Sequence, residues 1–407
     1  MTITRAHLFW RRTAAALVAL ALFLCCFPAP EAALAASDGM VRVRLTRLGA
    51  RSSLSFTTTC AYYVDGNTAR AIPAGAQATV EATGGQLYLT VNGSLTALGA
   101  SCTLARGEGG ARGVRFTSPS VSGLYCGDLM LSVSGGSIVP ILRIYIEDYL
   151  YGVVGYEMSA SWPLEALKAQ AVAAYTNVQR LKADPDSTLE GADISDDPAR
   201  HQGYLDEAAR REKWGDNYDA YNEKLTEAVT AVRGQTLTYD GAYITATYCA
   251  LCPGRTESAA NIWGGEVPYL QSVTSPGDRL SPDYTETTVL SAEEFRTKAA
   301  ADTEIVLGDD PSVWLTDTQY SENETGVVTS VTVGGKTMTG QQLRTLLSLR
   351  SPAFTVEYAD GQFTFTCTGN GHGVGMSQYG ADHMARQGST YEEILAHYYP
   401  GTTLSGA

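Results

Sequence analysis

The sequence predicts an α+β fold, in which a small β-rich domain precedes a mixed domain of short helices and antiparallel strands. Residues 37–136 alternate apolar and polar side chains, and Gly-Gly pairs interrupt them. After about residue 137, apolar side chains recur at helical spacing. The chain has 407 residues, and single cores stop growing at roughly 250–300 residues. We therefore predict two domains, at 37–136 and 137–407.

The first 36 residues are typical of an export signal. Arg5, Arg11 and Arg12 precede an apolar run at 14–27, and Ala33 and Ala35 offer a small-residue cleavage site. The run is shorter than the roughly 20 residues of a bilayer span. We predict a signal peptide or, alternatively, a retained N-terminal membrane anchor. Both place the rest of the chain outside the cytoplasm, at the membrane face or in the cell wall.

Alternation predicts strands at 41–45 and 86–91, the second ending at an Asn92-Gly93 hairpin turn. No group of catalytic residues stands out in 37–136. We interpret this region as an accessory module.

A strand at 137–146 and a helix from Asp148 are predicted next. Ser161 is then expected to cap a longer helix, with Pro163 in its first turn. The apolar stripe of that helix consists of Leu164, Leu167, Ala171, Tyr175 and Val178. Further strands are expected at 236–248 and at 327–333.

The chain is predicted to end in two short helices. Ser377 can cap a helix that runs to Gln387, with Gly388 as its terminating glycine. Thr390 and Glu393 form a capping box for the last helix.

The net charge of −14 argues against a nucleic-acid partner, which would require a basic surface. Six of the eight cysteines lie beyond the leader. Export permits disulfides, but six cysteines allow 15 pairings and the sequence does not choose among them.

Glu157 is the first candidate for chemistry. It lies between two predicted helices, among Val153, Val154, Tyr156, Met158 and Trp162. An apolar pocket disfavours the ionised carboxyl and raises its pKa, which makes a general acid usable near neutral pH. A surface glutamate in a turn is the alternative.

A second candidate is the glycine-rich segment 369–380. His372 is its one side chain that titrates near neutrality, and Ser377 and Gln378 lie at a helix start. The P-loop lysine and the dinucleotide spacing are absent. A packed turn is the alternative.

Cys249 and Cys252 admit a redox pair, a local disulfide or part of a metal site. A metal would need further ligands, for which His201 is a candidate. A solvent-facing histidine is the commoner explanation of His201.

Four ordered blocks resemble the stage II sporulation protein D (amidase-enhancer) family. The first comprises EDYLYGVVGYEM (147–158) and WPLEALKAQAVAA (162–174). The second comprises GRTES (254–258), WGG (263–265) and PYL (268–270). The third comprises LRTLL (343–347) and LRS (349–351), and the fourth GHGVGMSQYGA (371–381) and YYPG (398–401). The resemblance does not cover 37–136.

The resemblance implies a lytic transglycosylase that cleaves peptidoglycan strands stripped of stem peptides, leaving 1,6-anhydro-N-acetylmuramic acid ends. It implies a role in wall remodelling and engulfment during sporulation, with an N-acetylmuramoyl-L-alanine amidase as partner. Glu157 matches the family's catalytic residue, and no cofactor is required. We predict substrate contacts by His372, Ser377, Gln378, Tyr379, Lys168 and Gln170.

Two departures from the family pattern matter. Tyr175 replaces a usual arginine and removes a charge. Some members bind zinc through a cysteine at the position of Ser195, which is a poor zinc ligand. A zinc site rebuilt from His201 with Cys249 or Cys252 is the remaining metal hypothesis. The rival functions are a non-catalytic glycan-binding amidase enhancer and a hydrolase that makes reducing ends.

Overall fold

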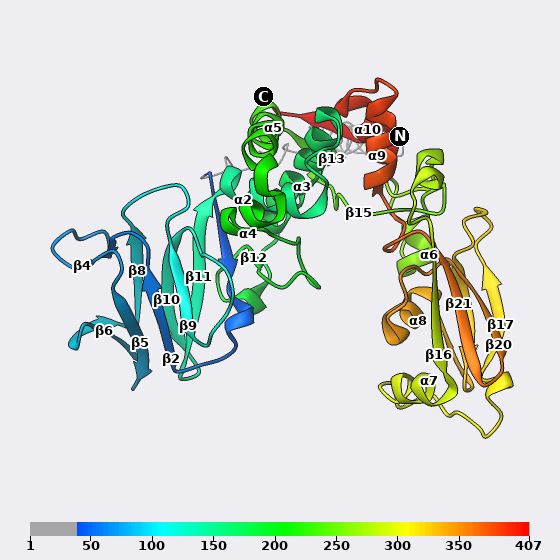
Figure 1. Cartoon of the computed structure of the whole chain (residues 1–407), viewed down its shortest axis with the longest axis horizontal. Helices are drawn as coiled ribbons and strands as arrows, with labels where there is room; N and C mark the ends of the chain where they lie inside the picture. The colour runs from blue at the N-terminus through cyan, green and yellow to red at the C-terminus, as the bar shows by residue number, and fades with distance from the viewer. Residues whose placement is uncertain (1–38, 407) are drawn as a thin grey trace, which may run out of the picture. The chain divides into compact units, whose positions relative to one another are not determined.

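The computed structural model describes residues 39–406, which form one compact unit. It confirms the predicted α+β class, because helices and mostly antiparallel sheets alternate along the chain (Figure 1). The predicted leader at 1–36 lies outside the described residues. No helix within 39–406 is both long and apolar enough to span a membrane.

Two sheets make up the β-rich region, with strand orders β12-β1-β11-β10-β8-β3-β4 and β7-β6-β5-β2-β9. Alternating side chains are buried along β1, β2 and most of β10, as the period of two requires. The strands are β1 (Met40–Arg44), β2 (Ser53–Thr58), β3 (Tyr62–Val64), β4 (Ala71–Ile72), β5 (Gln77–Thr83), β6 (Gln86–Val91), β7 (Ser94–Gly99), β8 (Ser101–Arg106), β9 (Val114–Ser118), β10 (Asp128–Ser134), β11 (Ser137–Tyr145) and β12 (Ile194–Ser195).

The strands predicted at 41–45 and 86–91 are confirmed by β1 and β6. The hairpin β10–β11 pairs from Asp128 with Arg143 to Ser134 with Ser137. The domain boundary predicted between 136 and 137 lies in the turn of this hairpin. The first sheet therefore contains strands from both sides of that boundary, and β12 joins it in parallel to β1.

Helices form the layer that carries the candidate residues. The central helix, α3, packs against α2, α5, α9 and α10, and its small buried side chains, including Ala166, Ala169 and Ala173, allow close approach. The helices are α2 (Ile146–Glu157), α3 (Leu164–Ala183), α4 (Glu207–Trp214), α5 (Tyr218–Ala231), α6 (Ala259–Trp263), α7 (Ala292–Ala299), α8 (Gly340–Leu347), α9 (Gln378–Arg386) and α10 (Tyr391–Tyr398). Short 3₁₀ turns are η1 (Thr46–Leu48), η2 (Ser187–Leu189), η3 (Gly215–Asn217), η4 (Pro276–Leu280) and η5 (Pro311–Val313).

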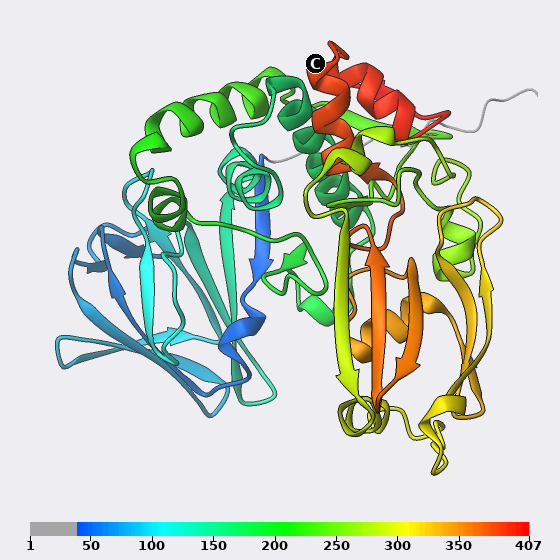
Figure 2. The same ribbon diagram turned by 45° about the vertical axis from the view of Figure 1, so that its right-hand side comes forward.

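A separate hydrophobic core lies within 290–367 and is centred on Phe295, Phe363 and Phe365. Two three-stranded sheets, β16-β21-β20 and β17-β18-β19, contribute to it (Figure 2). The remaining strands are β13 (Thr236–Tyr239), β14 (Ala242–Tyr243), β15 (Tyr248–Cys249), β16 (Thr285–Ser291), β17 (Leu315–Tyr320), β18 (Val328–Val333), β19 (Lys336–Met338), β20 (Phe354–Ala359), β21 (Gln362–Thr368), β22 (Met376–Ser377) and β23 (Thr403–Ser405).

The predicted helix signals are mostly confirmed. Ser377 accepts a bond from Gly380 N at the start of α9, and Thr390 forms the capping box of α10. The predicted cap at Ser161 is wrong: α3 begins at Leu164, with Pro163 as its N-cap residue and no side-chain cap. The Ser161 hydroxyl instead contacts that of Ser159 at 2.8 Å, because the Trp162-Pro163 pair keeps the chain extended before the helix.

Candidate functional site

Glu157 is the last residue of α2 and is half-buried. Its Oε1 accepts a bond from the backbone N–H of Gly203 at 3.2 Å, and its Oε2 accepts one from Gln378 Nε2 at 3.3 Å. The Tyr248 side chain also hydrogen-bonds the carboxyl. All three partners are neutral, so no charge within these contacts compensates that of the carboxylate.

The pKa of Glu157 is raised because burial disfavours the charged form, although the bonds from Gln378, Gly203 and Tyr248 oppose that shift. The position at the C-terminal end of α2 acts in the same direction as burial, since the helix dipole is negative there. A carboxyl with a raised pKa is better suited to donate a proton than an exposed glutamate, and it can accept one once ionised.

Gln378 reaches Glu157 through the pairing of two short parallel strands. Tyr248 in β15 pairs with Met376 in β22, and α9 begins two residues later. Gly375 makes this pairing sterically feasible. Its φ is +75°, and a Cβ there would lie 2.1 Å from the Thr247 carbonyl oxygen. The glycine-rich segment 369–380 therefore places the Gln378 amide next to the Glu157 carboxyl.

Gln170, on α3, extends this amide cluster. It is fully buried, and its Oε1 accepts a bond from Gln378 Nε2 at 3.4 Å. Its Nε2 has no hydrogen-bond partner among the described residues. Gln170 and Gln378, two of the predicted substrate-binding residues, thus lie together at Glu157.

Gln202 and Tyr248 complete the site and were not predicted. The Tyr248 hydroxyl donates to Gln202 Oε1 at 3.0 Å. Gln202 Nε2 in turn lies 3.4 Å from the Ala174 carbonyl and from the Tyr149 hydroxyl. Gln202 immediately precedes Gly203, whose N–H bonds Glu157, and it lies outside the four blocks of family resemblance.

The contacts of His372 are with Val374, Trp263 and the Tyr248 backbone. Its Nδ1 accepts the Val374 N–H at 3.0 Å, its ring lies 5.1 Å from that of Trp263, and it hydrogen-bonds the Tyr248 backbone. Burial, assisted by Arg344, lowers the pKa of His372 to about 4. It is therefore neutral near pH 7 and is suited to positioning Tyr248.

Ser377 and Tyr379 flank Gln378 but face other partners. The Ser377 hydroxyl is fully buried and donates to Asp278 Oδ1 at 2.5 Å. Tyr379 packs edge-on against Trp162, with ring centroids 5.0 Å apart. Ser377 thus anchors the start of α9, and Tyr379 covers the Trp162 linker that follows Glu157.

Asp278, in η4, is a fully buried carboxylate that the sequence did not single out. It also accepts bonds from Ser275 Oγ and from Cys252 Sγ, the latter at 3.0 Å. Burial raises its pKa. Because these bonds join Ser377, at the start of α9, to Cys252 and Ser275, we interpret the cluster as the support of α9.

Lys168 is engaged elsewhere on α3. Its Nζ lies 2.7 Å from Glu165 Oε1 and 5.6 Å from the Tyr391 ring. Glu165 also accepts the Tyr391 N–H. Lys168 therefore ties α3 to α10 rather than meeting the Glu157 carboxyl.

The residues of the zinc hypothesis do not fit a metal. The His201 Nδ1 lies 2.8 Å from the Ser195 hydroxyl, and Cys252 faces Asp278. No group of three or more His, Cys, Asp or Glu side chains that could hold a metal was found within 39–406. The six cysteines of that range are all free thiols.

Tyr175 lies away from Glu157. It is near Tyr243, whose pKa is raised by burial and to a smaller extent by Tyr175. Five positions after Gln170, it is rotated by roughly 140° around the helix. The departure from the family's arginine therefore falls on a different face of α3 from the amide cluster.

Comparison with known proteins gives matches to one family. A family model described as stage II sporulation protein matches residues 134–239, which include Glu157, Gln170 and Gln202. The chain is 38% identical over 267 residues to stage II sporulation protein D of Bacillus subtilis, covering 65% of this chain and 76% of that protein. It is 37% identical to the protein of the same name from Bacillus amyloliquefaciens, covering 65% of this chain and 75% of that protein. The amidase enhancer of Bacillus subtilis is 30% identical, over 63% of this chain and 40% of that protein. The chain belongs to the stage II sporulation protein D family.

Proposed function

We propose that this protein is a lytic transglycosylase that cleaves the glycan strands of peptidoglycan, with Glu157 as its acid and base. The observation that carries the proposal is the half-buried Glu157 carboxyl with a raised pKa and only neutral hydrogen-bond partners. Such a carboxyl can be protonated when the substrate binds and charged after the bond breaks.

The reaction needs one proton carrier. Glu157 donates its proton to the oxygen that links N-acetylmuramic acid to N-acetylglucosamine, and the C1–O bond breaks. The oxocarbenium-like C1 is then attacked by the 6-hydroxyl of the same sugar. The Glu157 carboxylate takes the hydroxyl proton, which regenerates the acid and leaves a 1,6-anhydro end.

The neutral hydrogen-bond partners of Glu157 are consistent with a reaction that uses a single carboxyl. A hydrolase of the ordinary kind pairs its acid with a second carboxylate that serves as nucleophile or activates water. The hydrogen-bond partners of Glu157 among residues 39–406 are Gly203, Gln378 and Tyr248. Gln378 donates to the carboxylate and favours it in the second half of the reaction, without ever competing for the proton.

We further propose that the protein works on the extracytoplasmic side during sporulation, on strands that an amidase has stripped of stem peptides. The names of the relatives, stage II sporulation protein D and amidase enhancer, support a wall-related role and an amidase partner.

Mass spectrometry of digested strands tests the proposal. Amidase-treated strands incubated with the wild-type protein should yield 1,6-anhydro ends, and Glu157→Gln should yield none. Glu147→Gln is the matched control, because Glu147 lies in the first turn of the same helix and pairs with Arg233 at 3.0 Å. Anhydro ends from Glu157→Gln at the wild-type rate would refute the assignment, and reducing ends would indicate a hydrolase.

The second candidate is a non-catalytic enhancer of an amidase, which the name of the Bacillus subtilis relative favours. It predicts no cleavage by the wild-type protein, while amidase stimulation and strand retention persist in Glu157→Gln.

A further inference from the structure

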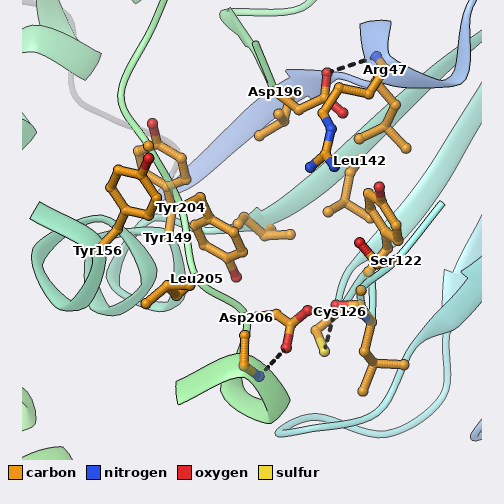
Figure 3. Close-up of a pocket in the computed structure, with 18 of the residues that line it drawn as sticks. Arg47, Ser122, Cys126, Leu142, Tyr149, Tyr156, Asp196, Tyr204, Leu205 and Asp206 are labelled. Atoms are coloured by element: carbon orange, nitrogen blue, oxygen red, sulfur yellow. Dashed lines mark hydrogen bonds between the residues drawn. The ribbon is translucent and has the colours of Figure 1, made fainter. Parts of the chain in front are cut away.

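A cavity of about 670 Å³ adjoins the Glu157 site, because Gly203, which donates its N–H to Glu157, is among the residues that line it. One wall comes from the β-rich region, at 43–47, 115 and 122–126. The other comes from α2 and from 195–212 (Figure 3). A cavity of this size is in the range of small-ligand sites.

The carboxylates of Asp206 and Asp196 form hydrogen bonds from one wall of the cavity to the other. Asp206 Oδ2 accepts the Leu124 N–H at 2.9 Å, while its Oδ1 caps α4 through the Ala209 N–H at 2.8 Å. Asp196 Oδ1 accepts the Thr46 N–H at 2.7 Å. Because both walls are fixed by bonds to backbone, the cavity is preformed.

We propose that this cavity binds N-acetylhexosamine units of a glycan strand, as a second saccharide site next to the catalytic one. The identity of the glycan rests on the proposed function, but the class of ligand follows from the lining. The β-rich wall lies outside the residues 134–239 that match the family model.

Tyrosine rings give the first part of the recognition. Tyr149 and Tyr204 stack with centroids 5.9 Å apart, and Tyr204 and Tyr156 are 39% and 47% exposed. Exposed tyrosines offer an apolar face and a polar edge. A pyranose ring has the complementary surfaces, with C–H groups on its faces and hydroxyls at its rim.

The polar groups give the second part. Asp196 lines the cavity, and its Oδ2 is a buried acceptor with no hydrogen-bond partner among the described residues. Arg47 directs its guanidinium toward the cavity (Figure 3) and supplies donors to sugar oxygens.

The charge balance decides between a neutral and an anionic ligand. Asp196, Asp206 and Glu212 line the cavity, against Arg47 and Arg115. Three carboxylates opposite two guanidiniums leave no excess of positive charge for an anion. A neutral ligand with many hydroxyls uses both kinds of group.

A sugar bound in the cavity would also affect the position of the Glu157 carboxyl. The Tyr156 ring lies against Gly203, where an added Cβ would be 2.1 Å from the ring. Gly203 donates its N–H to Glu157. A sugar on Tyr156 and Tyr204 therefore fixes the segment that holds Glu157.

Ser122→Trp tests the site, because Ser122 is exposed and lines the cavity, and an indole there would fill it. Ser120→Trp is the matched control, since Ser120 is an exposed serine two residues away that does not line the cavity. Both are made in the full chain carrying Glu157→Gln, which prevents turnover. The probe is chitotetraose, followed by calorimetry and by hydrogen–deuterium exchange.

Chitotetraose should protect peptides covering 122–126 and 203–209 from exchange. Ser122→Trp should weaken its binding at least tenfold and abolish that protection, and Ser120→Trp should leave both unchanged. Arg47→Ala, at an exposed position, should weaken binding severalfold. Equal affinity of the two tryptophan variants would overturn the proposal, as would protection by a stem peptide but not by the saccharide.

The outcome is separable from that of the proposed function. Anhydro ends from the wild-type protein without protection at 122–126 would refute the saccharide site alone. Protection at 122–126 without anhydro ends would refute the transglycosylase and leave the saccharide site standing.

Discussion

Gln378 Nε2 lies 3.3 Å from Glu157 Oε2, although 221 residues separate the two in the chain. The contact joins the end of α2 to the start of α9. It stabilises the ionised form of the carboxyl, whereas burial stabilises the neutral form. The balance between these two effects sets the pH range in which Glu157 can donate a proton, and it leads to the first prediction.

Gln378→Ala should move the alkaline limb of the pH profile of kcat/KM to higher pH. Loss of the amide donor disfavours the carboxylate, so Glu157 stays protonated further into the alkaline range. A lost bond worth about 1 kcal/mol corresponds to roughly 0.7 pH units. The profile is measured on amidase-treated strands. Gln387→Ala, at the exposed C-cap of α9, should leave the limb in place, and a shift to lower pH in Gln378→Ala would contradict the assignment.

Glu157→Gln should raise the melting temperature at neutral pH by about 2 °C. The folded-state pKa of Glu157 is raised. The folded protein therefore binds the proton more tightly than the unfolded chain, and the stability contributed by this carboxyl falls as pH rises through its folded pKa. Thermal unfolding at pH 4 and pH 7.5 should show the gain only at the higher pH.

Glu257 is a control for which the expected pH dependence of stability has the opposite sign. Although burial raises its pKa, bonds from Ser321, Thr325, Asn323 and the Ser258 N–H outweigh burial and hold it below its usual value. The stability that Glu257 contributes is present above the unfolded pKa and is lost as pH falls through the folded pKa. Glu257→Gln should lower the melting temperature at pH 7.5 and lower it less at pH 4. The same sign for both variants would contradict the analysis.

Gly375→Ala should destabilise the protein and abolish most activity. A methyl group would lie 2.1 Å from the Thr247 carbonyl, which accepts the Met376 N–H at 3.1 Å. Displacing that pairing moves Gln378. Gly361→Ala isolates the backbone effect, because Gly361 has a φ of +77° and no atom within 4 Å of its added Cβ. It should cost about 1–2 kcal/mol, and Gly375→Ala about 1–3 kcal/mol more. Urea denaturation measures both, and equal costs would show that no clash exists at Gly375.

Tyr175→Arg should leave kcat/KM on amidase-treated strands within about twofold of wild type. Tyr175 lies on a different face of α3 from Gln170 and beside Tyr243. Restoring the family's arginine should therefore add no charge at Glu157. A tenfold increase in kcat/KM would instead place position 175 in the site.

The sequence predicted those features that depend on neighbouring residues. Alternation located β1 and β6, and Ser377 and Thr390 marked the starts of α9 and α10 correctly. Glu157 was found through a run of family residues around it. Ser161 was misassigned as a cap because the extended Trp162-Pro163 pair delays the helix.

Contacts between distant segments could not be predicted in this way. Gln202 and Tyr248, 46 positions apart, meet because the chain between them returns to the same point. No local sequence pattern identifies either residue as a partner of Glu157. In the structure, the six residues predicted to bind substrate lie in three different places. Gln170 and Gln378 lie at the carboxyl, His372, Ser377 and Tyr379 support its surroundings, and Lys168 bonds Glu165.

The sequence by itself determined the α+β class, and it singled out Glu157 and the glycine-rich segment 369–380 as candidates. Periodicity, capping and motif spacing are short-range properties, so they can be seen along the chain. The tertiary structure alone decided that Glu157 has neutral partners, that Tyr175 lies near Tyr243 and that a cavity adjoins Gly203. Burial and hydrogen bonding depend on which distant segments share a volume, and packing of the folded chain sets both.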